Sequence, residues 1–300
     1  MAARDLLLTG ASGFVGRHLL ARATAAGLGA QPCDWDLRDA ELTARRLAEL
    51  RPAAVVHLAA SPRGGDAWKA LADDVRMAGA LIAGLAEHAP DAPLLATGSA
   101  AQYGRGCATA LREDDPTAPL SPYGALKCAL EEALTAGPLR RGVRVSWTRS
   151  FNHVGPGQGD DAPVAQWVAQ IAAAERAGSG ELRTGRLDVV RDFLDVRDVA
   201  DAYLALVACD TAEGVVNVCS GTATELRVLA ELLVEQARVP VALVRDPALE
   251  RGNDPQRVVG DPARLRELTG WRPRVTLERS VAEMLALARE RVRATAGVPA

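Results

Sequence analysis

Three residues in the first half of the chain have the types and spacing needed to protonate a carbonyl oxygen. Tyr123 and Lys127 are four residues apart, which places both side chains on one face of a helix. A free tyrosine has a pKa of about 10, and a nearby ammonium lowers that pKa because it favours the phenolate. Tyr123 is therefore predicted to be a general acid that Lys127 tunes. Ser99 is predicted to donate to the same carbonyl and to stabilise its developing charge.

The position of Ser99 supports this interpretation over a simpler one. An isolated Tyr-x-x-x-Lys pattern is more often a surface pair on an amphipathic helix. Ser99, however, follows the apolar run Leu94–Gly98, which predicts a buried strand that ends at the serine. Ligands bind at the carboxyl edge of an open parallel sheet. A serine that only completes a turn is the alternative.

A glycine-rich segment predicts a site for the diphosphate of a dinucleotide. Its glycines have the spacing G-x-x-G-x-x-G and lie between an apolar run and a helical pattern. Glycine lets backbone N–H groups approach a pyrophosphate, and the N-terminus of a helix adds a partial positive charge. An ordinary glycine-rich turn is the alternative. The residues of this turn predicted to bind the cofactor are Gly10, Gly13, Phe14, Val15 and Gly16.

A second acidic segment is predicted to contact the adenosine end of the cofactor. An acidic residue about 20 positions after the glycines commonly binds the ribose, and both Asp34 and Asp36 are candidates. Arg38 would instead suit a 2′-phosphate, so the segment leaves both NAD and NADP open. A cap for the helix expected from Asp39 is the structural alternative. The residues predicted to bind the cofactor are Asp36, Leu37 and Arg38.

Alternating apolar runs and helical patterns provide the framework for these residues. This alternation predicts βαβ units and an α/β fold with a doubly wound parallel sheet of the Rossmann type. The expected strands are Leu6–Thr9, a weaker one near Leu28–Cys33, Ala53–Leu58, Leu94–Gly98 and Val143–Arg149. The expected helices are Phe14–Ala26, Asp39–Leu50, Ala67–Glu87 and Tyr123–Ala136.

The alternation loosens after Arg149, which predicts a second and smaller part of the molecule. Residues 1–150 are expected to form an NAD(P)-binding domain, and residues 151–300 mainly a substrate-binding α/β lobe. Residues 196–219 are expected to return to the first domain as a helix and a strand. The substrate is then expected between the two parts. The other expected helices are Val164–Ala177, Glu225–Gln236 and a long one from Leu277.

Composition argues against several other classes of protein. The 300 residues are 48% hydrophobic, and a net charge of -3 gives no reason to expect nucleic acid or an anionic membrane as a partner. Five cysteines without a C-x-x-C pair, and no signal-peptide pattern, predict a cytoplasmic protein with buried free thiols. Four scattered histidines predict no metal site. No apolar run is long enough to span a membrane.

Together these residues resemble the extended short-chain dehydrogenase/reductases, the NAD-dependent epimerase/dehydratase family. The segment H-L-A-A at 57–60 resembles the family's H-x-A-A beside the cofactor, which implies that Leu58, Ala59 and Ala60 bind it. Later segments are similar to nucleotide-sugar 4-ketoreductases of the GDP-4-keto-6-deoxymannose reductase type. These segments are R-S-F-N-H-V-G-P-G-Q (149–158), R-D-F-L-D-V-R-D (191–198), N-V-C-S-G (217–221), G-D-P with Leu265 (260–265) and T-G-W-R-P (269–273).

The resemblance covers nearly the whole chain and implies a reaction. It implies an NAD(P)H-dependent ketoreductase, with NADPH slightly favoured, that reduces the 4-keto group of a nucleotide-linked 4-keto-6-deoxyhexose. It also implies a homodimer through the helices Ala67–Glu87 and Tyr123–Ala136. The planar fork of arginine suits diphosphate oxygens, although a surface salt bridge is the alternative for each arginine. The residues that the resemblance places against the substrate are Ser99, Ala100, Asn152, Arg191 and Arg251.

Three departures from the family pattern bear on the reaction. Ala100 and Ala101 stand where sugar 4,6-dehydratases carry Asp-Glu, which argues against dehydration. Asp74 stands where the family usually has Asn, and we expect an altered internal hydrogen bond there. The segment Ser61–Trp68 is short for a sugar-binding loop. The alternatives are a nucleotide-sugar 4-epimerase, a ketoreductase of a non-sugar metabolite such as a polyketide, and a non-catalytic NAD(P)-sensing protein.

Overall fold

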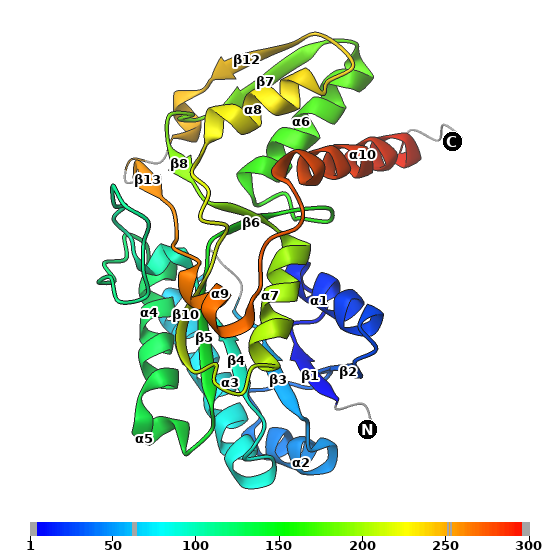
Figure 1. Ribbon diagram of the computed structural model, residues 1–300. Helices are drawn as coiled ribbons and strands as arrows, with labels where there is room; N and C mark the ends of the chain where they lie inside the picture. The colour runs from blue at the N-terminus through cyan, green and yellow to red at the C-terminus, as the bar shows by residue number, and fades with distance from the viewer. Residues whose placement is uncertain (1–4, 62–64, 251, 253, 296–300) are drawn as a thin grey trace.

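A six-stranded parallel sheet forms the centre of the larger part of the molecule (Figure 1). The computed structural model describes residues 5–61, 65–250, 252 and 254–295. The strand order is β10-β5-β4-β3-β1-β2. The chain adds β2 on one side of β1 and all later strands on the other side, so the order of the strands reverses between β1 and β3. The strands are β1 (Leu6–Thr9), β2 (Ala30–Pro32), β3 (Ala54–His57), β4 (Leu94–Thr97), β5 (Val145–Ser150) and β10 (Gly214–Val218). The predicted fold class is confirmed.

Helices cover both faces of this sheet, as a doubly wound fold requires. One face packs against α1 (Phe14–Ala25) and α7 (Val196–Val207) through a core that includes Leu19 and Tyr203. The other face packs against α2 (Ala40–Leu50), α3 (Ala67–His88) and α4 (Pro122–Thr135), and the short helix α5 (Gly137–Arg140) follows α4. The strands β1 and β3 are buried along their whole length, which explains their continuous apolar sequences.

Local sequence fixes where the helices near the site begin. Ser121 caps α4 by accepting a hydrogen bond from Gly124 N at 3.1 Å, and Pro122 occupies the first turn, where its missing N–H costs nothing. Asp39 caps α2 in the same way, accepting from Leu42 N at 2.9 Å. Tyr123 therefore lies in the first turn of α4, at the end that faces the carboxyl edge of the sheet.

Segments from the second half of the chain complete the larger part. Both α7 and β10 return to it, and β10 pairs with β5. The short helix α9 (Ala263–Thr269) also packs there, since Leu265 and Trp271 belong to the same core as α1. The sequence predicted the return of α7 and β10. It predicted no helix at residues 263–269 and counted that segment with the lobe. The seven residues of α9 bury only one side chain, Leu265, too little pattern to indicate which core it joins.

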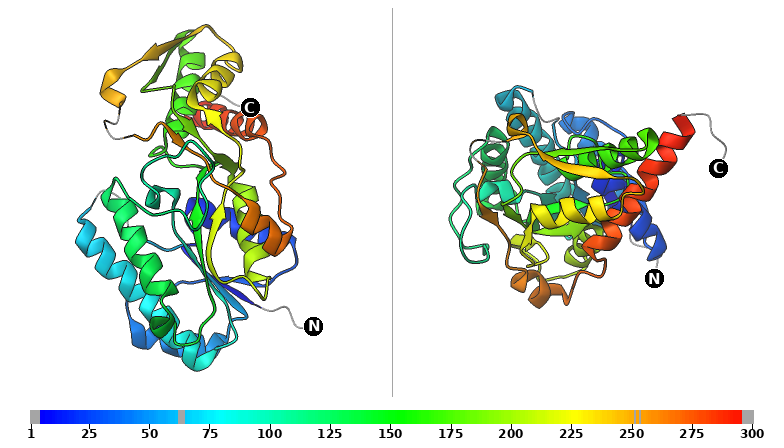
Figure 2. Two further views of the ribbon diagram at one scale, coloured as in Figure 1. Left: turned by 60° about the vertical axis from the view of Figure 1, so that its left-hand side comes forward. Right: turned by 90° about the horizontal axis from the view of Figure 1, so that it is seen from above.

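The smaller part lies above the sheet in Figure 1 and has its own apolar core. Its centre holds Trp167, Ile171 and Leu285. Figure 2 shows its helices and its small sheets stacked beyond the carboxyl edge of the large sheet. Its elements are β6 (Asn152–Val154), α6 (Pro163–Ala177), β7 (Gly180–Thr184), β8 (Val190–Arg191), β9 (Phe193–Asp195), β11 (Thr224–Glu225), α8 (Leu226–Glu235), β12 (Val241–Arg245), β13 (Arg257–Val258) and α10 (Leu277–Thr295).

The exposure of the five cysteines contradicts part of one prediction. All five are free, as predicted, but only Cys219 is buried. Cys107 is exposed and the other three are partly exposed, so the expectation of buried thiols was wrong for four of them. In the described parts of the chain, no helix combines the length and apolar character needed to cross a membrane.

Candidate functional site

The turn between β1 and α1 has glycines where a side chain would block the approach of a bound group. Gly10 has φ +67°, and a Cβ there would lie 2.7 Å from Ala59 N. A Cβ at Gly16 would collide with the carbonyl oxygen of Gly10. A Cβ at Gly13 would meet only Gly10 O, at 3.2 Å, so the turn stays open on its outer side. This cradle and the N-terminus of α1, at Phe14, fit a dinucleotide diphosphate.

The carboxyl ends of β1 and β3 are tied together beside this turn. Thr9 Oγ1 accepts hydrogen bonds from Leu58 N and Ala59 N, both at 3.1 Å, and lies 2.8 Å from His57 Nδ1. Burial, and secondly the charge of Lys127, lower the pKa of His57 to about 3. His57 is therefore neutral at physiological pH and holds the strand ends together instead of transferring protons.

The acidic segment after β2 forms an ion pair. Arg38 donates to Asp36 Oδ2 at 2.7 Å, and the hydrogen bonds from Arg38 lower the pKa of Asp36 to about 2. Asp39, not Asp36, caps α2. The side chains of Asp36 and Arg38 are exposed and have no role in capping this helix. The Leu37 side chain is buried in the core, which leaves only its backbone to contact a cofactor.

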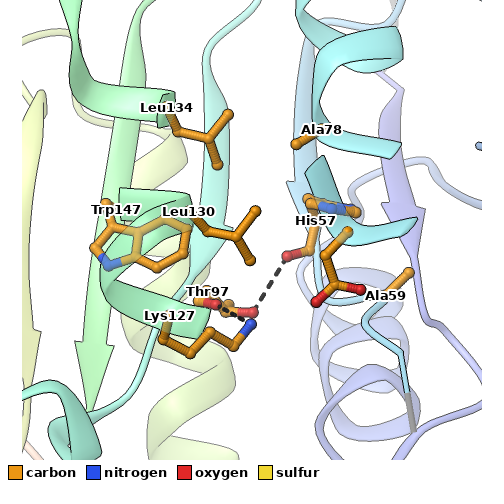
Figure 3. A pocket seen from close by; sticks show the side chains of 9 residues that line it. His57, Ala59, Ala78, Thr97, Lys127, Leu130, Leu134 and Trp147 are labelled. Atoms are coloured by element: carbon orange, nitrogen blue, oxygen red, sulfur yellow. Dashed lines mark hydrogen bonds between the residues drawn. The ribbon is translucent and has the colours of Figure 1, made fainter. Parts of the chain in front are cut away.

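Lys127 lies on α4, one helical turn after Tyr123. Its ammonium lies beside Thr97 at the end of β4 (Figure 3). Its Nζ donates to Thr97 O at 2.9 Å and lies 6.0 Å from the centre of the Tyr123 ring. Ser99 lies two residues after the end of β4, and its Oγ accepts from Ala101 N at 3.2 Å at the start of a short 3₁₀ helix, η1 (Ala100–Gln102). The structure thus brings the three predicted residues to one edge of the sheet.

Close packing joins η1 to the first turn of α4. A Cβ at Gly124 would lie 2.6 Å from Ala101 O, so only glycine allows this approach. Ser99 caps η1 and Tyr123 lies in the first turn of α4, so this packing fixes the backbones that carry the two residues. Such fixed placement is what general acid catalysis at a carbonyl needs.

A small cavity lies beneath the Lys127 ammonium. Its volume of about 10 Å³ is close to the room that one water molecule needs. Its polar lining comes from His57, Asp74, Thr97 and Lys127. Asp74 Oδ1 accepts from Ser61 N at 2.7 Å. The amide oxygen of the asparagine that the family usually has at this position could accept the same hydrogen bond.

The residues expected against the substrate are less closely grouped. Asn152 lies on β6 and donates to Asp192 O at 3.3 Å. Arg191 donates to Asp254 at 2.6 Å, and only 11% of its side chain is exposed, so this ion pair is not a simple surface salt bridge. Ala100 opens η1 beside Ser99. Arg251 lies outside the described residues.

Sequence reasoning missed a buried polar group directly behind Ser99. Gln102, at the end of η1, is fully buried, and its amide donates to Glu131 on α4 at 2.7 Å. Glu131 in turn accepts from Arg149 Nε at 2.8 Å. The spacing Ser99-x-x-Gln102 is that of a capping box, a signal in the sequence that could have indicated Gln102.

The described residues contain no group of three or more His, Cys, Asp or Glu side chains placed to hold a metal ion. The polar groups at the carboxyl edge of the sheet are instead suited to a dinucleotide and to proton transfer.

Comparison with known proteins identifies the family. Residues 6–219 match the model of the NAD dependent epimerase/dehydratase family. The chain belongs to this family. The match begins with β1 and ends just after β10, so it covers the whole six-stranded sheet of this epimerase/dehydratase family member.

Relatives within the family carry three activities in their names. The chain is 37% identical to the GDP-6-deoxy-D-mannose reductase of Pseudomonas aeruginosa, covering 96% of this chain and 98% of that protein. It is 34% identical to a dTDP-6-deoxy-L-talose 4-dehydrogenase (NAD(P)(+)) of Kitasatospora kifunensis, over 92% of each chain. It is 29% identical to a UDP-glucose 4-epimerase of Azospirillum brasilense, over 91% of this chain and 88% of that protein.

A solved structure has the same overall arrangement. It is that of RMD from Pseudomonas aeruginosa complexed with NADPH, which superposes with a TM-score of 0.84 at 34% identity. The alignment covers 96% of this chain and 99% of that one. The predicted resemblance to the extended short-chain dehydrogenase/reductases is confirmed.

Proposed function

We propose that this protein is an NAD(P)H-dependent ketoreductase that reduces the 4-keto group of a nucleotide-linked 4-keto-6-deoxyhexose. The observation that carries the proposal is the position of Lys127. It is anchored to Thr97 O at the end of β4, one turn from Tyr123 and beside the element that begins at Ser99. The reductase and 4-dehydrogenase relatives support the choice of a sugar 4-ketone.

Each of the three residues has a distinct role in this proposal. The Tyr123 hydroxyl is the general acid that protonates the carbonyl oxygen. Ser99 Oγ accepts from Ala101 N, which leaves its own hydroxyl hydrogen to donate to the same oxygen and to orient it. The Lys127 ammonium stabilises the phenolate left on Tyr123. NAD(P)H, when bound, supplies the hydride.

The glycine turn and the strand ends beside it are the proposed cofactor site. Backbone N–H groups at Phe14 and Val15 suit the diphosphate because they lie in the first turn of α1. The N–H of Gly13 donates to Gly10 O at 3.0 Å, so Gly13 contributes to the site by having no side chain. Leu58, Ala59 and Ala60 follow β3 beside the turn. The exposed pair Asp36–Arg38 suits the adenosine ribose or its 2′-phosphate. NADPH is favoured because the similar P. aeruginosa protein was solved with NADPH.

The substrate contacts are proposed from residues on the lobe and on η1. Arg191 would bind the diphosphate with its planar fork, and Asn152 would contact the nucleotide sugar. Ala100 would pack against the hexose, where it offers no carboxylate for dehydration. Arg251 would also contact the substrate, as the family resemblance implies.

Changing Arg191 tests the substrate class. Arg191→Ala should raise the KM for the nucleotide sugar at least tenfold. It should leave the affinity for NAD(P)H unchanged, because Arg191 lies on β8 in a small sheet of the lobe and the glycine turn follows β1 of the large sheet. Charged hydrogen bonds of this kind contribute about 1.5–3 kcal/mol. Steady-state kinetics with both ligands varied would measure the change. An unchanged KM for the sugar would mean that the substrate carries no diphosphate at Arg191.

Changing Tyr123 tests the chemistry. Tyr123→Phe removes only the phenolic oxygen, so kcat should fall by about 10²–10⁴ while the cofactor still binds. Single-turnover loss of NAD(P)H absorbance with NDP-4-keto-6-deoxyhexoses would measure the rate. Parent protein that reduces none of these ketones, or a Tyr123→Phe variant that reduces them at the parent rate, would overturn the proposal.

A 4-epimerase is the second candidate, favoured by the likeness to a UDP-glucose 4-epimerase. An epimerase retains its cofactor through the reaction. Protein purified and dialysed without added cofactor should therefore be examined by mass spectrometry. Stoichiometric NAD that survives dialysis, together with interconversion of UDP-hexoses, would favour the epimerase over the reductase.

The proposal also includes a cytoplasmic homodimer. The helices α3 and α4 are the expected interface, and α3 exposes two large apolar side chains, with Trp68 80% and Val75 42% exposed. Sedimentation velocity should give the mass of a dimer, and a monomeric mass at micromolar concentration would contradict it.

A further inference from the structure

The buried side chains of Gln102 and Trp147 form a link between the proposed catalytic serine and lysine. Gln102 Oε1 accepts two hydrogen bonds, one from Ser99 N at 3.0 Å and one from Trp147 Nε1 at 3.2 Å. Its Nε2 donates to Glu131 Oε2 at 2.7 Å. Two N–H donors on one side and a carboxylate on the other leave the amide only one orientation.

Trp147 connects this amide to the lysine. It lies on β5, is 1% exposed, and its ring is 5.8 Å from Lys127 Nζ, on the side that Figure 3 shows. An ammonium within about 6 Å of an aromatic ring is attracted to the face of that ring. One indole therefore contacts the lysine with its ring and the amide with its N–H.

The surroundings of Gln102 and Trp147 are tightly packed. A Cβ at Gly98 would collide with both Gln102 Oε1 and Trp147 Nε1, so the strand end fits tightly over them. Behind the amide, Glu131 is held by Arg149, and their side chains are only 14% and 6% exposed. Charge-assisted hydrogen bonds such as these are the strongest in proteins.

We propose that Gln102 and Trp147 are positioning residues that hold the Ser99 peptide and the Lys127 ammonium in one fixed geometry. Both are buried, so neither touches the substrate. The inference rests on the proposed function, because it assigns the pair to the ketone reduction that Ser99 and Lys127 serve. Loss of the link displaces the two groups relative to each other, and a displacement of about 1 Å costs up to about 100-fold in rate.

Two variants test the link at different strengths. Trp147→Phe keeps an aromatic ring near Lys127 and removes the donor to Gln102, so kcat should fall about three- to tenfold with the fold intact. The smaller ring also leaves a void, which the Trp167→Phe control shares. Gln102→Leu removes all three hydrogen bonds and should lower kcat about 10- to 100-fold. Because the tryptophan bond is already lost in Gln102→Leu, adding Trp147→Phe to it should lower kcat by less than Trp147→Phe does alone.

The control is Trp167→Phe, another buried tryptophan, which lies in the core of the lobe. It should leave kcat within twofold of the parent, even if it lowers the unfolding temperature. The pH dependence of kcat gives a second measurement. Displacing Lys127 weakens its effect on Tyr123, so the pKa that limits kcat should rise in Gln102→Leu and stay unchanged in Trp167→Phe.

The outcomes separate this inference from the proposed function. Parent protein without ketone reduction would overturn the proposed function itself. An active parent whose folded Trp147→Phe variant keeps the parent kcat and pH profile would overturn the positioning role alone. Equal loss of kcat in Trp147→Phe and Trp167→Phe would also overturn it, because the effect would then be one of stability. If Gln102→Leu does not fold, Trp147→Phe still decides.

Discussion

Several polar residues of this protein are buried for structural reasons that their motifs do not reveal. In the segment R-D-F-L-D-V-R-D, only Arg191 is proposed to contact substrate. Asp192 accepts from Ser220 N at 2.8 Å and from Gly221 N at 2.9 Å, which ties β8 to the end of β10. Burial raises the pKa of Asp192. A motif that suggests a binding site therefore also encodes the connection between the two parts of the molecule.

His57 should make the stability of the protein depend on pH. Its pKa of about 3 in the folded state lies far below the value of about 6.5 expected in the unfolded chain. Below about pH 6.5 the unfolded chain takes up a proton that the folded chain does not, so the free energy of unfolding falls by about 1.4 kcal/mol per pH unit. Above about pH 6.5 this effect vanishes.

Urea unfolding at about pH 7 and about pH 5 would measure this slope, which spans about 2 kcal/mol from pH 6.5 to 5. His57→Asn should start from a lower stability and lose less on acidification. The other three histidines are present in both proteins, so the difference isolates His57. Identical slopes for parent and variant would show that His57 takes up a proton in the folded state.

At the scale of elements, the turn between β1 and α1 joins conformation to binding. Gly10 and Gly16 are required by packing, because a side chain at either one would collide with backbone. Gly13 is different, since its nearest neighbour would be 3.2 Å from a Cβ and could give way. A substitution at Gly13 therefore tests binding with little effect on the fold.

Gly13→Asp should abolish NAD(P)H binding, because a carboxylate would stand where the diphosphate is expected. Calorimetry should show at least a 100-fold loss of affinity, while the unfolding temperature changes by only a few degrees. Gly137→Asp is the matched control, since a Cβ at Gly137 meets no atom within 4 Å and the site is remote from the turn. Undiminished affinity in Gly13→Asp would remove the turn from the cofactor site.

The sequence predicted the elements whose signals are local. Long periodic helices such as α3, and apolar strands such as β1, lie within a few residues of their expected bounds. The strands β8, β11 and β13 have only two residues each, too few to show any period. They form because the lobe brings their backbones together, which no local pattern encodes.

The same reasoning explains what was missed in the candidate site. Ser99, Tyr123 and Lys127 follow from short spacings and from the position of a strand end. Gln102 and Trp147 are 45 residues apart, and only the pairing of β4 with β5, which sets Ala96 opposite Trp147, brings them together. A contact that depends on sheet register cannot be inferred from spacing along the chain.

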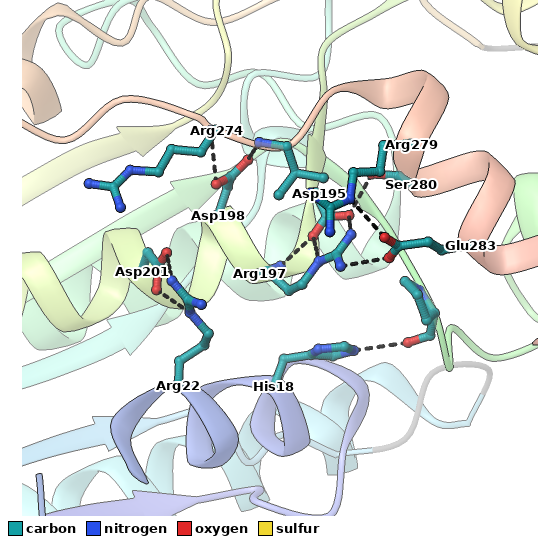
Figure 4. A network of polar contacts seen from close by, with 12 residues as sticks. His18, Arg22, Asp195, Arg197, Asp198, Asp201, Arg274, Arg279, Ser280 and Glu283 are labelled. Atoms are coloured by element: carbon teal, nitrogen blue, oxygen red, sulfur yellow. Dashed lines mark hydrogen bonds and ion pairs between the residues drawn. The ribbon is translucent and has the colours of Figure 1, made fainter. Parts of the chain in front are cut away.

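At the scale of the whole molecule, α7 is the joint between the two parts (Figure 4). It contacts α1 through Arg22 and Asp201, at 2.6 Å. At its N-terminus Arg197 pairs with Glu283 of α10, also at 2.6 Å. Asp198 accepts from Arg274 N at 3.0 Å and Val275 N at 2.9 Å, in the segment that leads from α9 to α10.

Asp198 should matter more to stability than its neighbour Asp201. Asp198→Ala leaves two backbone N–H groups without their acceptor and should lower the free energy of unfolding by about 2–4 kcal/mol. Asp201→Ala removes a partly exposed ion pair and should cost less than about 1 kcal/mol. Urea unfolding of both variants would compare them. Equal losses would mean that Asp198 does not hold the α9–α10 segment in place.

The position of β10 and α7 in the chain has a consequence for synthesis on the ribosome. The first 150 residues emerge with five of the six strands of the large sheet, but β5 then has an unpaired edge, and α7 is missing from the face that carries Leu8 and Val56. The helix α7 is complete only at residue 207, and the edge of β5 stays open until β10 is complete at residue 218. During that interval the nascent chain presents an apolar face and an open strand edge, the features that promote aggregation and recruit chaperones. A chain truncated after residue 150 should therefore aggregate when expressed, whereas one that extends past β10 should retain the sheet.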